Sequence, residues 1–219
     1  MTALTSHLKV TAIRSADAVV VMNTAMLEHV RQIRHQTVIK APPGVDVVRF
    51  APLHHGWRSD GYLLSVCRLG DERKGIDRLI RAYAELAKLL PKVPALVLAG
   101  RGTLPSTVLQ LLDSLTVGHN VVIRSDVQPE QLPGLYAGAS VYVQASHEEG
   151  LGISVLEAMA CGLPVVCTDT DGTRDTVVDG ETGFVVSQEP ASDVPQAIAG
   201  RIREILEGRG AARDQVSFA

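Results

Sequence analysis

Short apolar runs alternate with amphipathic stretches along most of the chain. The apolar runs are rich in Val, Ile and Leu, which is typical of strands buried in a parallel sheet. The stretches between them place apolar residues at helical spacing. The runs predicted to be strands are 18–22, 37–40, 62–67, 95–100, 120–123, 141–144, 164–167 and 183–186. The segments predicted to be helices are 24–34, 77–90, 104–115, 131–138, 153–161, 172–178 and 192–206.

This order of elements predicts an α/β fold, with a doubly wound, Rossmann-like parallel sheet built from right-handed βαβ units. Two of the predicted helices begin near a hydroxyl residue that can accept a hydrogen bond from a free backbone amide. We therefore expect Thr24 and Ser192 to be N-caps.

Proline and glycine are concentrated between two of the predicted strands, which indicates a domain boundary. We expect residues 61–207 to form one complete domain, 44–60 to be an interdomain linker and 208–219 to be a weakly ordered tail. Residues 1–43 hold two strands and one or two helices, which is too little for a core of their own. We expect them to be the end of a preceding domain.

The charge balance argues against two classes of partner. Lys and Arg together number 21 and Asp and Glu 24, which gives a net charge of −3. A mildly acidic chain without a long basic run is a poor binder of nucleic acid or of anionic membrane surfaces. No apolar stretch reaches the roughly 18 residues of a membrane-spanning helix.

The three cysteines, Cys67, Cys161 and Cys167, lie inside apolar runs and show no metal-ligand spacing. We interpret them as buried free thiols, which favours a cytoplasmic protein. The N-terminus has no hydrophobic signal region.

The stretch from Ser146 to Val165 contains the most informative chemistry. A strand runs into a glycine-flanked turn, and a helix follows. This arrangement presents free N–H groups and a positive helix end at the mouth of a parallel sheet, where phosphates bind. Glu149 and Glu157 flank the turn, and carboxylates accept hydrogen bonds from hydroxyls. Phosphate donors and hydroxyl acceptors together suit a sugar nucleotide.

A second candidate feature follows the strand predicted at 62–67. Arg68 lies at the end of that strand and Lys74 lies just before the next helix, so both cations fall at the carboxyl edge of the sheet. A guanidinium fork and an ammonium group are a suitable clamp for a diphosphate. Taken alone this is weak evidence, because Arg and Lys near loop ends are usually solvated.

Several motifs in order resemble one known family, the retaining family 4 glycosyltransferases with the GT-B fold. Arg68 and Lys74, followed by Gly-Ile-Asp-Arg-Leu-Ile-Arg-Ala, resemble its diphosphate-binding motif. The stretch from Glu149 to Glu157 with Ala-Met-Ala is similar to its paired-glutamate motif. The resemblance covers roughly residues 17 to 207 and includes the motifs Gly162-Leu-Pro-Val, Asp171-Gly-Thr-Arg-Asp, Asp179-Gly-Glu-Thr-Gly-Phe-Val-Val and Gly44-Val-Asp-Val-Val-Arg-Phe-Ala-Pro.

The resemblance implies a role for each site residue. The catalytic group would be Arg68 and Lys74, which would hold the pyrophosphate, and Glu149, which would hold the donor sugar. Glu157 would accept hydrogen bonds from the ribose. The other donor-binding residues implied are Gly150, Leu151, Gly152, Ile153 and Ser154 at the turn, and Arg124 and Val127 near the nucleobase.

Other polar groups in these loops have simpler interpretations. The family often has a glycine where this chain has Ser125 or Asp126, which leaves the base open. His147 is expected to be a loop residue rather than an acid or base. One of the neighbours Glu148 and Glu149 is expected to be only solvated. Asp169 and Asp171 are weak metal-ligand candidates, so no cofactor and no catalytic metal are expected.

The resemblance implies transfer of a sugar from a UDP-, GDP- or ADP-sugar to an acceptor hydroxyl with retention of configuration. The acceptor side of a GT-B enzyme belongs to the first domain, so we expect this chain to bind the donor and to transfer poorly alone. The exposed apolar surface of a partial domain favours either a homo-oligomer or pairing with the missing N-terminal domain. Peripheral attachment of the full-length enzyme to a membrane stays open. The alternative is a non-catalytic, Rossmann-like interaction or nucleotide-binding module.

Overall fold

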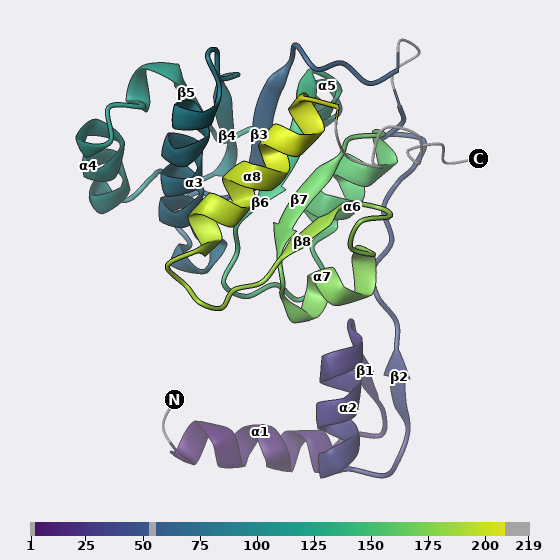
Figure 1. Ribbon diagram of the computed structural model, residues 1–219. Helices are drawn as coiled ribbons and strands as arrows, with labels where there is room; N and C mark the ends of the chain where they lie inside the picture. The colour runs from purple at the N-terminus through teal and green to yellow at the C-terminus, as the bar shows by residue number, and fades with distance from the viewer. Residues whose placement is uncertain (1–2, 53–55, 209–219) are drawn as a thin grey trace. The chain divides into compact units, whose positions relative to one another are not determined.

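The computed structural model describes residues 3–52 and 56–208, and the chain divides into two units, Met1–Gly44 and Val45–Ala219 (Figure 1). The expected tail lies outside the described residues, apart from Gly208. In the described ranges, no helix is long and apolar enough to cross a membrane.

The first unit is a small α/β arrangement around one parallel strand pair. Its elements are α1 (Ala3–Ser15), β1 (Val19–Val21), α2 (Thr24–Ile33) and β2 (Val38–Lys40). The N-cap of α2 is Asn23, whose Oδ1 accepts a hydrogen bond from the amide of Met26 at 2.7 Å. The expectation that Thr24 caps this helix is therefore wrong, because Thr24 is already its first helical residue. Arg34 is buried after α2 and donates to the carbonyls of Ile13 and Ala16.

The second unit contains a six-stranded parallel sheet in the order β5-β4-β3-β6-β7-β8. The doubly wound sheet predicted from the sequence is confirmed. Its strands are β3 (Tyr62–Arg68), β4 (Leu96–Arg101), β5 (Val121–Ser125), β6 (Ala139–Gln144), β7 (Val165–Thr168) and β8 (Phe184–Val186). Its α-helices are α3 (Ile76–Leu89), α4 (Ser106–Ser114), α5 (Leu132–Ala137), α6 (Ile153–Ala160), α7 (Asp171–Thr176) and α8 (Val194–Leu206). Single 3₁₀ turns occur at Glu72–Lys74, Gly118–Asn120 and Pro129–Gln131.

Helices cover both faces of this sheet. On the face seen in Figure 1, α3 and α8 pack with α4 over one apolar cluster that includes Leu98, Val143 and Ile198. On the other face, α5 and α6 cover a second cluster around Tyr142 and Val155. Burial on both sides explains why every residue of β6 is buried although its sequence alternates polar and apolar residues.

The segment expected to be a linker is anchored on the second unit. Phe50 is 4% exposed and makes an edge-to-face contact with Tyr136, with ring centroids 5.7 Å apart. The indole N–H of Trp57 donates to the carbonyl of Ser140 at 2.7 Å. The stretch at 44–60 therefore packs on this unit through Phe50 and Trp57, while most of its other described residues are exposed.

The last helix begins later than its sequence suggests. We expected Ser192 to be its N-cap, but α8 starts at Val194 and Asp193 occupies the cap position. Pro195 stands in the first turn, where a missing N–H costs nothing. The Ser192 hydroxyl donates to the Asp193 carboxylate instead of capping the helix.

Candidate functional site

The strand order reverses between β3 and β6, so the loops that follow these strands leave in opposite directions. In open α/β sheets ligands bind outside the carboxyl ends of the strands at such a switch point, and we call this place the crevice between β3 and β6. Arg68 ends β3, Lys74 ends the 3₁₀ turn after it, and Glu149 lies in the loop after β6. Gly75 stands between the two loops with a φ of 59°, and a Cβ there would overlap the carbonyl of Ala145. Only glycine lets the loops approach this closely.

Lys74 and Glu149 form an ion pair across this crevice. The Lys74 Nζ lies 2.7 Å from the Glu149 Oε2, and the two side chains are 16% and 15% exposed. The Gln144 amide donates to the same oxygen at 3.2 Å. Because a partly buried charge needs a partner, each side chain holds the other in the crevice.

Two buried polar atoms accompany this pair. Gln144 Oε1 and the Ser146 hydroxyl oxygen have no hydrogen-bond partner in the part of the chain that the structure describes. Gln144 is the last residue of β6, and its amide end reaches Glu149. Sequence reasoning missed Gln144, because a polar residue at a strand end gives no distinctive signal.

The turn after Glu149 brings the start of α6 to the same edge. Gly152 occupies its N-cap position with a φ of 79°. The amides of Val155 and Leu156 donate to the Gly152 carbonyl, whereas the earlier amides of an α-helix have no intrahelical acceptor. Gly172, in α7, donates its N–H to the Glu149 carbonyl at 3.0 Å. A Cβ on Gly172 would lie 2.6 Å from the Leu151 nitrogen, so α7 packs directly against the backbone of this turn. The turn after Glu149, here called the glutamate turn, is thus held both by the ion pair with Lys74 and by α7.

Arg68 occupies the same edge but is not joined to the central pair. Its guanidinium pairs with Asp71 at 3.4 Å and its side chain is 67% exposed. Arg73 also pairs with Asp71, at 2.8 Å, and hydrogen bonding from Arg73 lowers the pKa of that carboxyl. The exposed guanidinium of Arg68 is therefore paired with Asp71 rather than with Glu149.

Glu157 lies on α6 and is half-buried. The Tyr136 hydroxyl donates to its Oε2 at 2.7 Å, and burial raises the pKa of the carboxyl above its ordinary value. Tyr136 was not expected from the sequence, since it lies on a different helix. The two glutamates that are eight positions apart thus have different partners, Lys74 for one and a tyrosine hydroxyl for the other.

The end of β5 contributes more exposed groups, two strands away from β3. Arg124 is exposed and the amide of Val127 donates to the carbonyl of Gly100 at 3.2 Å. Asp126 has a positive φ of 53°, and its carboxylate accepts the N–H of Gly102 at 3.2 Å. These bonds tie the β5 loop to the β4 loop at the same edge of the sheet.

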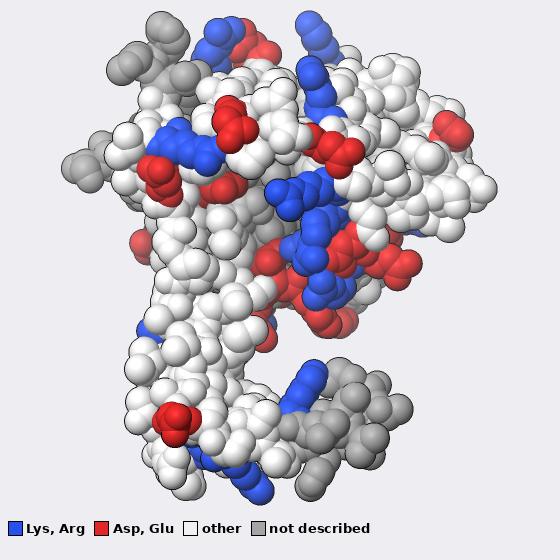
Figure 2. Space-filling model, turned by 180° about the vertical axis from the view of Figure 1, so that it is seen from behind, with Lys and Arg blue, Asp and Glu red and all other residues white. Residues whose placement is uncertain are grey.

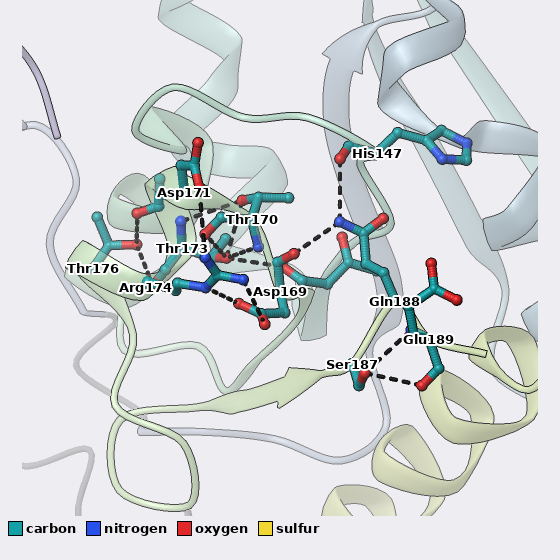
Figure 3. A network of polar contacts seen from close by, with 12 residues as sticks. His147, Asp169, Thr170, Asp171, Thr173, Arg174, Thr176, Ser187, Gln188 and Glu189 are labelled. Carbon is teal, nitrogen blue, oxygen red and sulfur yellow. Dashed lines mark hydrogen bonds and ion pairs between the residues drawn. The ribbon is translucent and has the colours of Figure 1, made fainter. Parts of the chain in front are cut away.

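Behind the glutamate loop lies a network of polar contacts (Figure 3). Asp169 pairs with Arg174 at 2.7 Å, and Asp171 pairs with the same guanidinium at 3.5 Å. Thr170 and Thr173 form a capping box at the start of α7. Among the described residues, no group of three or more His, Cys, Asp or Glu side chains is placed to hold a metal ion.

Charges of both signs are mixed on the surface opposite to that of Figure 1. Figure 2 shows basic and acidic side chains interspersed on this face, with no broad area of one sign. The distribution agrees with the net charge of −3, and the described residues on this face form no extended basic surface for a polyanion.

Comparison with known proteins identifies the family. Residues 55–219 match the family described as glycosyl transferases group 1. The chain belongs to this family. Group 1 relatives include a GDP-mannose-dependent alpha-(1-6)-phosphatidylinositol monomannoside mannosyltransferase of Mycolicibacterium smegmatis, 36% identical over 72% of this chain and 45% of that protein. A D-inositol 3-phosphate glycosyltransferase of Acidothermus cellulolyticus is 33% identical over 76% of this chain and 40% of its own length.

Solved glycosyltransferase structures share the fold, so the GT-B resemblance is confirmed. Sucrose-phosphate synthase from Thermosynechococcus elongatus has a TM-score of 0.79 at 24% identity and covers 96% of this chain and 54% of its own. The pneumococcal O-GlcNAc transferase has a TM-score of 0.77 at 21% identity, over 94% of this chain and 43% of its own. This group 1 chain spans less than half the length of the curated relatives named above.

The structure brings together only part of the predicted site. Lys74 and Glu149 touch each other, and the turn at Gly150, Leu151 and Gly152 continues into the α6 positions Ile153 and Ser154. Arg68 and Glu157 have other partners, and the β5 residues stand apart. This arrangement spreads polar groups along one edge of the sheet, as an extended ligand requires.

Proposed function

We propose that the second unit binds a nucleoside-diphosphate sugar at the crevice between β3 and β6, and that the enzyme transfers the sugar to an acceptor hydroxyl. The observation that supports this most is the Lys74–Glu149 pair at the topological switch point, beside the start of α6. Lys74 can bind a phosphate and Glu149 can accept hydrogen bonds from hydroxyl groups, and the two lie within one hydrogen-bond length of each other.

In this proposal the two cations bind the pyrophosphate. When the bond between the sugar carbon and the diphosphate oxygen breaks, the electron pair stays on the diphosphate and adds negative charge. Lys74, together with Arg68 after its rotation away from Asp71, stabilises that charge. The acceptor oxygen forms the new bond to the sugar carbon, and its proton passes to the departing diphosphate. The proposal places no resident metal in this step.

The two carboxylates bind the hydroxyl groups of the donor. Glu149 and the amides of the turn, from Gly150 to Ser154, hold the sugar. Glu157 accepts hydrogen bonds from the ribose, and Arg124 and Val127 border the base. Retention of anomeric configuration is part of the proposal and is supported by the resemblance of the paired-glutamate motif to the retaining family.

The identity of the donor is proposed from the relatives. The relative that is 36% identical is named for GDP-mannose, whereas the pneumococcal transferase is described in complex with UDP. We therefore propose GDP-mannose first, ahead of UDP- and ADP-sugars. All groups assigned above serve the donor, so we also propose that these 219 residues alone bind the donor and transfer sugar poorly. The non-catalytic module is not favoured, because the family is one of transferases.

The test is a thermal-shift and calorimetry panel of UDP, GDP, ADP and dTDP, each with a sugar conjugate. A ligand that binds the native state raises the melting temperature by mass action. Lys74→Met should lose the shift, and Lys88→Met, an exposed position on α3, should keep it. Absence of binding by the wild-type chain to every nucleotide would refute the proposed site.

A further inference from the structure

Arg78 is a buried cation on α3 that the proposed function does not use. Its side chain lies under the loops and is 8% exposed as a residue. No ion pair between Arg78 and a carboxylate occurs within residues 3–52 and 56–208. A buried guanidinium without a carboxylate partner is costly, and burial lowers the pKa of this group. Such a guanidinium requires hydrogen-bond acceptors for its N–H groups.

The guanidinium has acceptors on two other segments of the chain. One nitrogen lies 2.8 Å from His147 Nδ1, and another donates to Gln188 Oε1 at 2.8 Å. The same nitrogen that bonds Gln188 also reaches the carbonyl of Ala145 at 3.4 Å. Arg78 therefore joins α3 to the loop after β6 and to the loop after β8.

His147 has one tautomer in this arrangement. A guanidinium only donates, so the Nδ1 that faces Arg78 must be the unprotonated nitrogen and the ring proton must be on Nε2. The backbone of His147 is also held on both sides. Its N–H donates to the Arg73 carbonyl at 2.7 Å, and its carbonyl accepts from Gln188 Nε2 at 3.1 Å. His147 is thus fixed through its ring, its N–H and its carbonyl.

Gln188 connects this point to the rest of the sheet edge. Figure 3 shows its side chain between His147 and Asp169. Its amide nitrogen donates to both of their backbone carbonyls while its oxygen accepts from Arg78. Arg78 is four residues after Lys74, and His147 is two residues before Glu149. The network therefore links the segment that holds one member of the ion pair to the loop that holds the other.

We propose that Arg78 is a positioning residue for the donor site, acting through His147 and Gln188 to fix the loop of Glu149 against α3. The proposal rests on the proposed function of that loop. Arg78 does not touch the substrate. Replacement by methionine would leave Gln188 Oε1 and His147 Nδ1 without their donor, which costs stability whatever the role of Arg78. Only a positioning role also predicts that the sugar conjugate loses more affinity than the diphosphate.

The experiment uses the full 219-residue chain with Arg78→Met and Arg78→Lys, and with Arg81→Met as an exposed control on the same helix. Lysine keeps the charge, but one ammonium cannot hold the forked arrangement of acceptors. Hydrogen exchange is measured on the peptide covering residues 145–152. Affinity is measured for whichever of UDP, GDP, ADP and dTDP the wild type binds best, and for its sugar conjugate.

We expect both Arg78 variants to increase exchange in residues 145–152 and to weaken the sugar conjugate several-fold more than the diphosphate. The diphosphate is held mainly by the β3 loop, whereas Glu149 holds the sugar. Arg81→Met should match the wild type in both measurements. Unchanged exchange and an unchanged ratio of the two affinities in both Arg78 variants would overturn the positioning role.

A second pair of variants keeps the test decisive if Arg78 cannot be replaced without unfolding. His147→Asn presents an acceptor oxygen near the place of Nδ1, and His147→Ala does not. Asparagine should retain the slow exchange of residues 145–152 and alanine should lose it. Equal exchange in the two variants would contradict the proposal. If the wild type binds no nucleotide, the proposed function fails, and hydrogen exchange still decides whether Arg78 orders the loop.

Discussion

Lys74 and Glu149, which are 75 positions apart in the chain, meet at 2.7 Å between Nζ and Oε2. One follows β3 and the other follows β6, the two strands between which the sheet reverses its order. Each satisfies the charge of the other. In the proposed function, a sugar nucleotide would replace this pairing with phosphate at Lys74 and hydroxyl groups at Glu149.

Lys74→Met should weaken binding of both the nucleoside diphosphate and its sugar conjugate. It removes a charged hydrogen bond to phosphate, worth about 1.5–3 kcal/mol, or roughly 10- to 150-fold in Kd. Isothermal titration calorimetry measures this loss. Lys88→Met is the control, because that lysine is exposed and pairs with Glu85 on the helix surface. Equal affinity in Lys74→Met and wild type would contradict the assignment.

Glu149→Gln should separate the two halves of the donor. Neutralising this carboxylate frees Lys74 for phosphate, so affinity for the diphosphate should rise. The sugar conjugate should lose affinity, because an amide is a weaker acceptor for sugar hydroxyls than a carboxylate. Calorimetry with both ligands gives the ratio of the two dissociation constants. A parallel fall for both ligands would place Glu149 at the phosphate rather than at the sugar.

Nucleotide affinity should depend on pH through Glu157. Burial raises the pKa of this carboxyl above its ordinary value of 4.5, so the folded chain holds the proton more tightly than the unfolded chain. Protonated Glu157 therefore contributes to the free energy of unfolding below pH 4.5. This contribution is lost as pH rises from 4.5 through the raised pKa. Ribose binding has the opposite dependence, because the ionised form accepts its hydroxyls. Affinity should fall as pH decreases toward about 4.5, and Glu157→Gln should flatten this acid limb in titrations at several pH values.

Gly172→Ala should disturb the glutamate turn without touching a ligand. The added Cβ would lie 2.6 Å from the Leu151 nitrogen, and relief of that overlap moves the backbone that follows Glu149. We expect a loss of about 1–3 kcal/mol in the free energy of unfolding and weaker binding of the sugar conjugate. Gly200→Ala is the matched control, since nothing lies within 4 Å of a Cβ there. It should stabilise α8 by up to about 1 kcal/mol and leave binding unchanged.

Phe50→Ala should destabilise the second unit, although the residue lies in the stretch predicted from the sequence to be a linker. Phe50 is 4% exposed against Tyr136, and removal of a buried phenylalanine costs about 3–5 kcal/mol. Urea unfolding followed by circular dichroism measures the change, and Val48→Ala, an exposed neighbour, is the control. An unchanged midpoint for Phe50→Ala would show that the segment does not pack on this domain in solution.

The cysteines should be unreactive in the folded chain. Burial raises the pKa of Cys67 and of Cys161 to about 11 and that of Cys167 to about 12. The reactive thiolate is therefore scarce at neutral pH. Iodoacetamide at about pH 8 should label the native chain slowly and the urea-unfolded chain at all three positions, as mass spectrometry can show. Fast labelling of one native cysteine would identify an opening of its cluster.

Much of the fold could be predicted from local pattern. Runs such as that of β4 and the amphipathic stretch of α3 have periodicities that depend only on neighbouring residues, and the parallel sheet follows from their alternation. Helix starts were less predictable. Asn23 rather than Thr24 caps α2, and α8 begins after Ser192, because adjacent polar residues compete for one cap and local sequence does not rank them.

The sequence by itself determined the order of strands and helices, the family, and the positions of the glutamate turn and of Lys74. These features depend on composition and spacing within short segments. Only the tertiary structure decided that Lys74 pairs with Glu149, that Arg68 turns to Asp71, and that Tyr136 contacts Glu157. The same holds for the contact of Arg78 with His147, which no spacing in the sequence indicates. The physical reason is that ion pairs and hydrogen bonds require approach within about 3 Å, and folding alone sets which distant loops come that close.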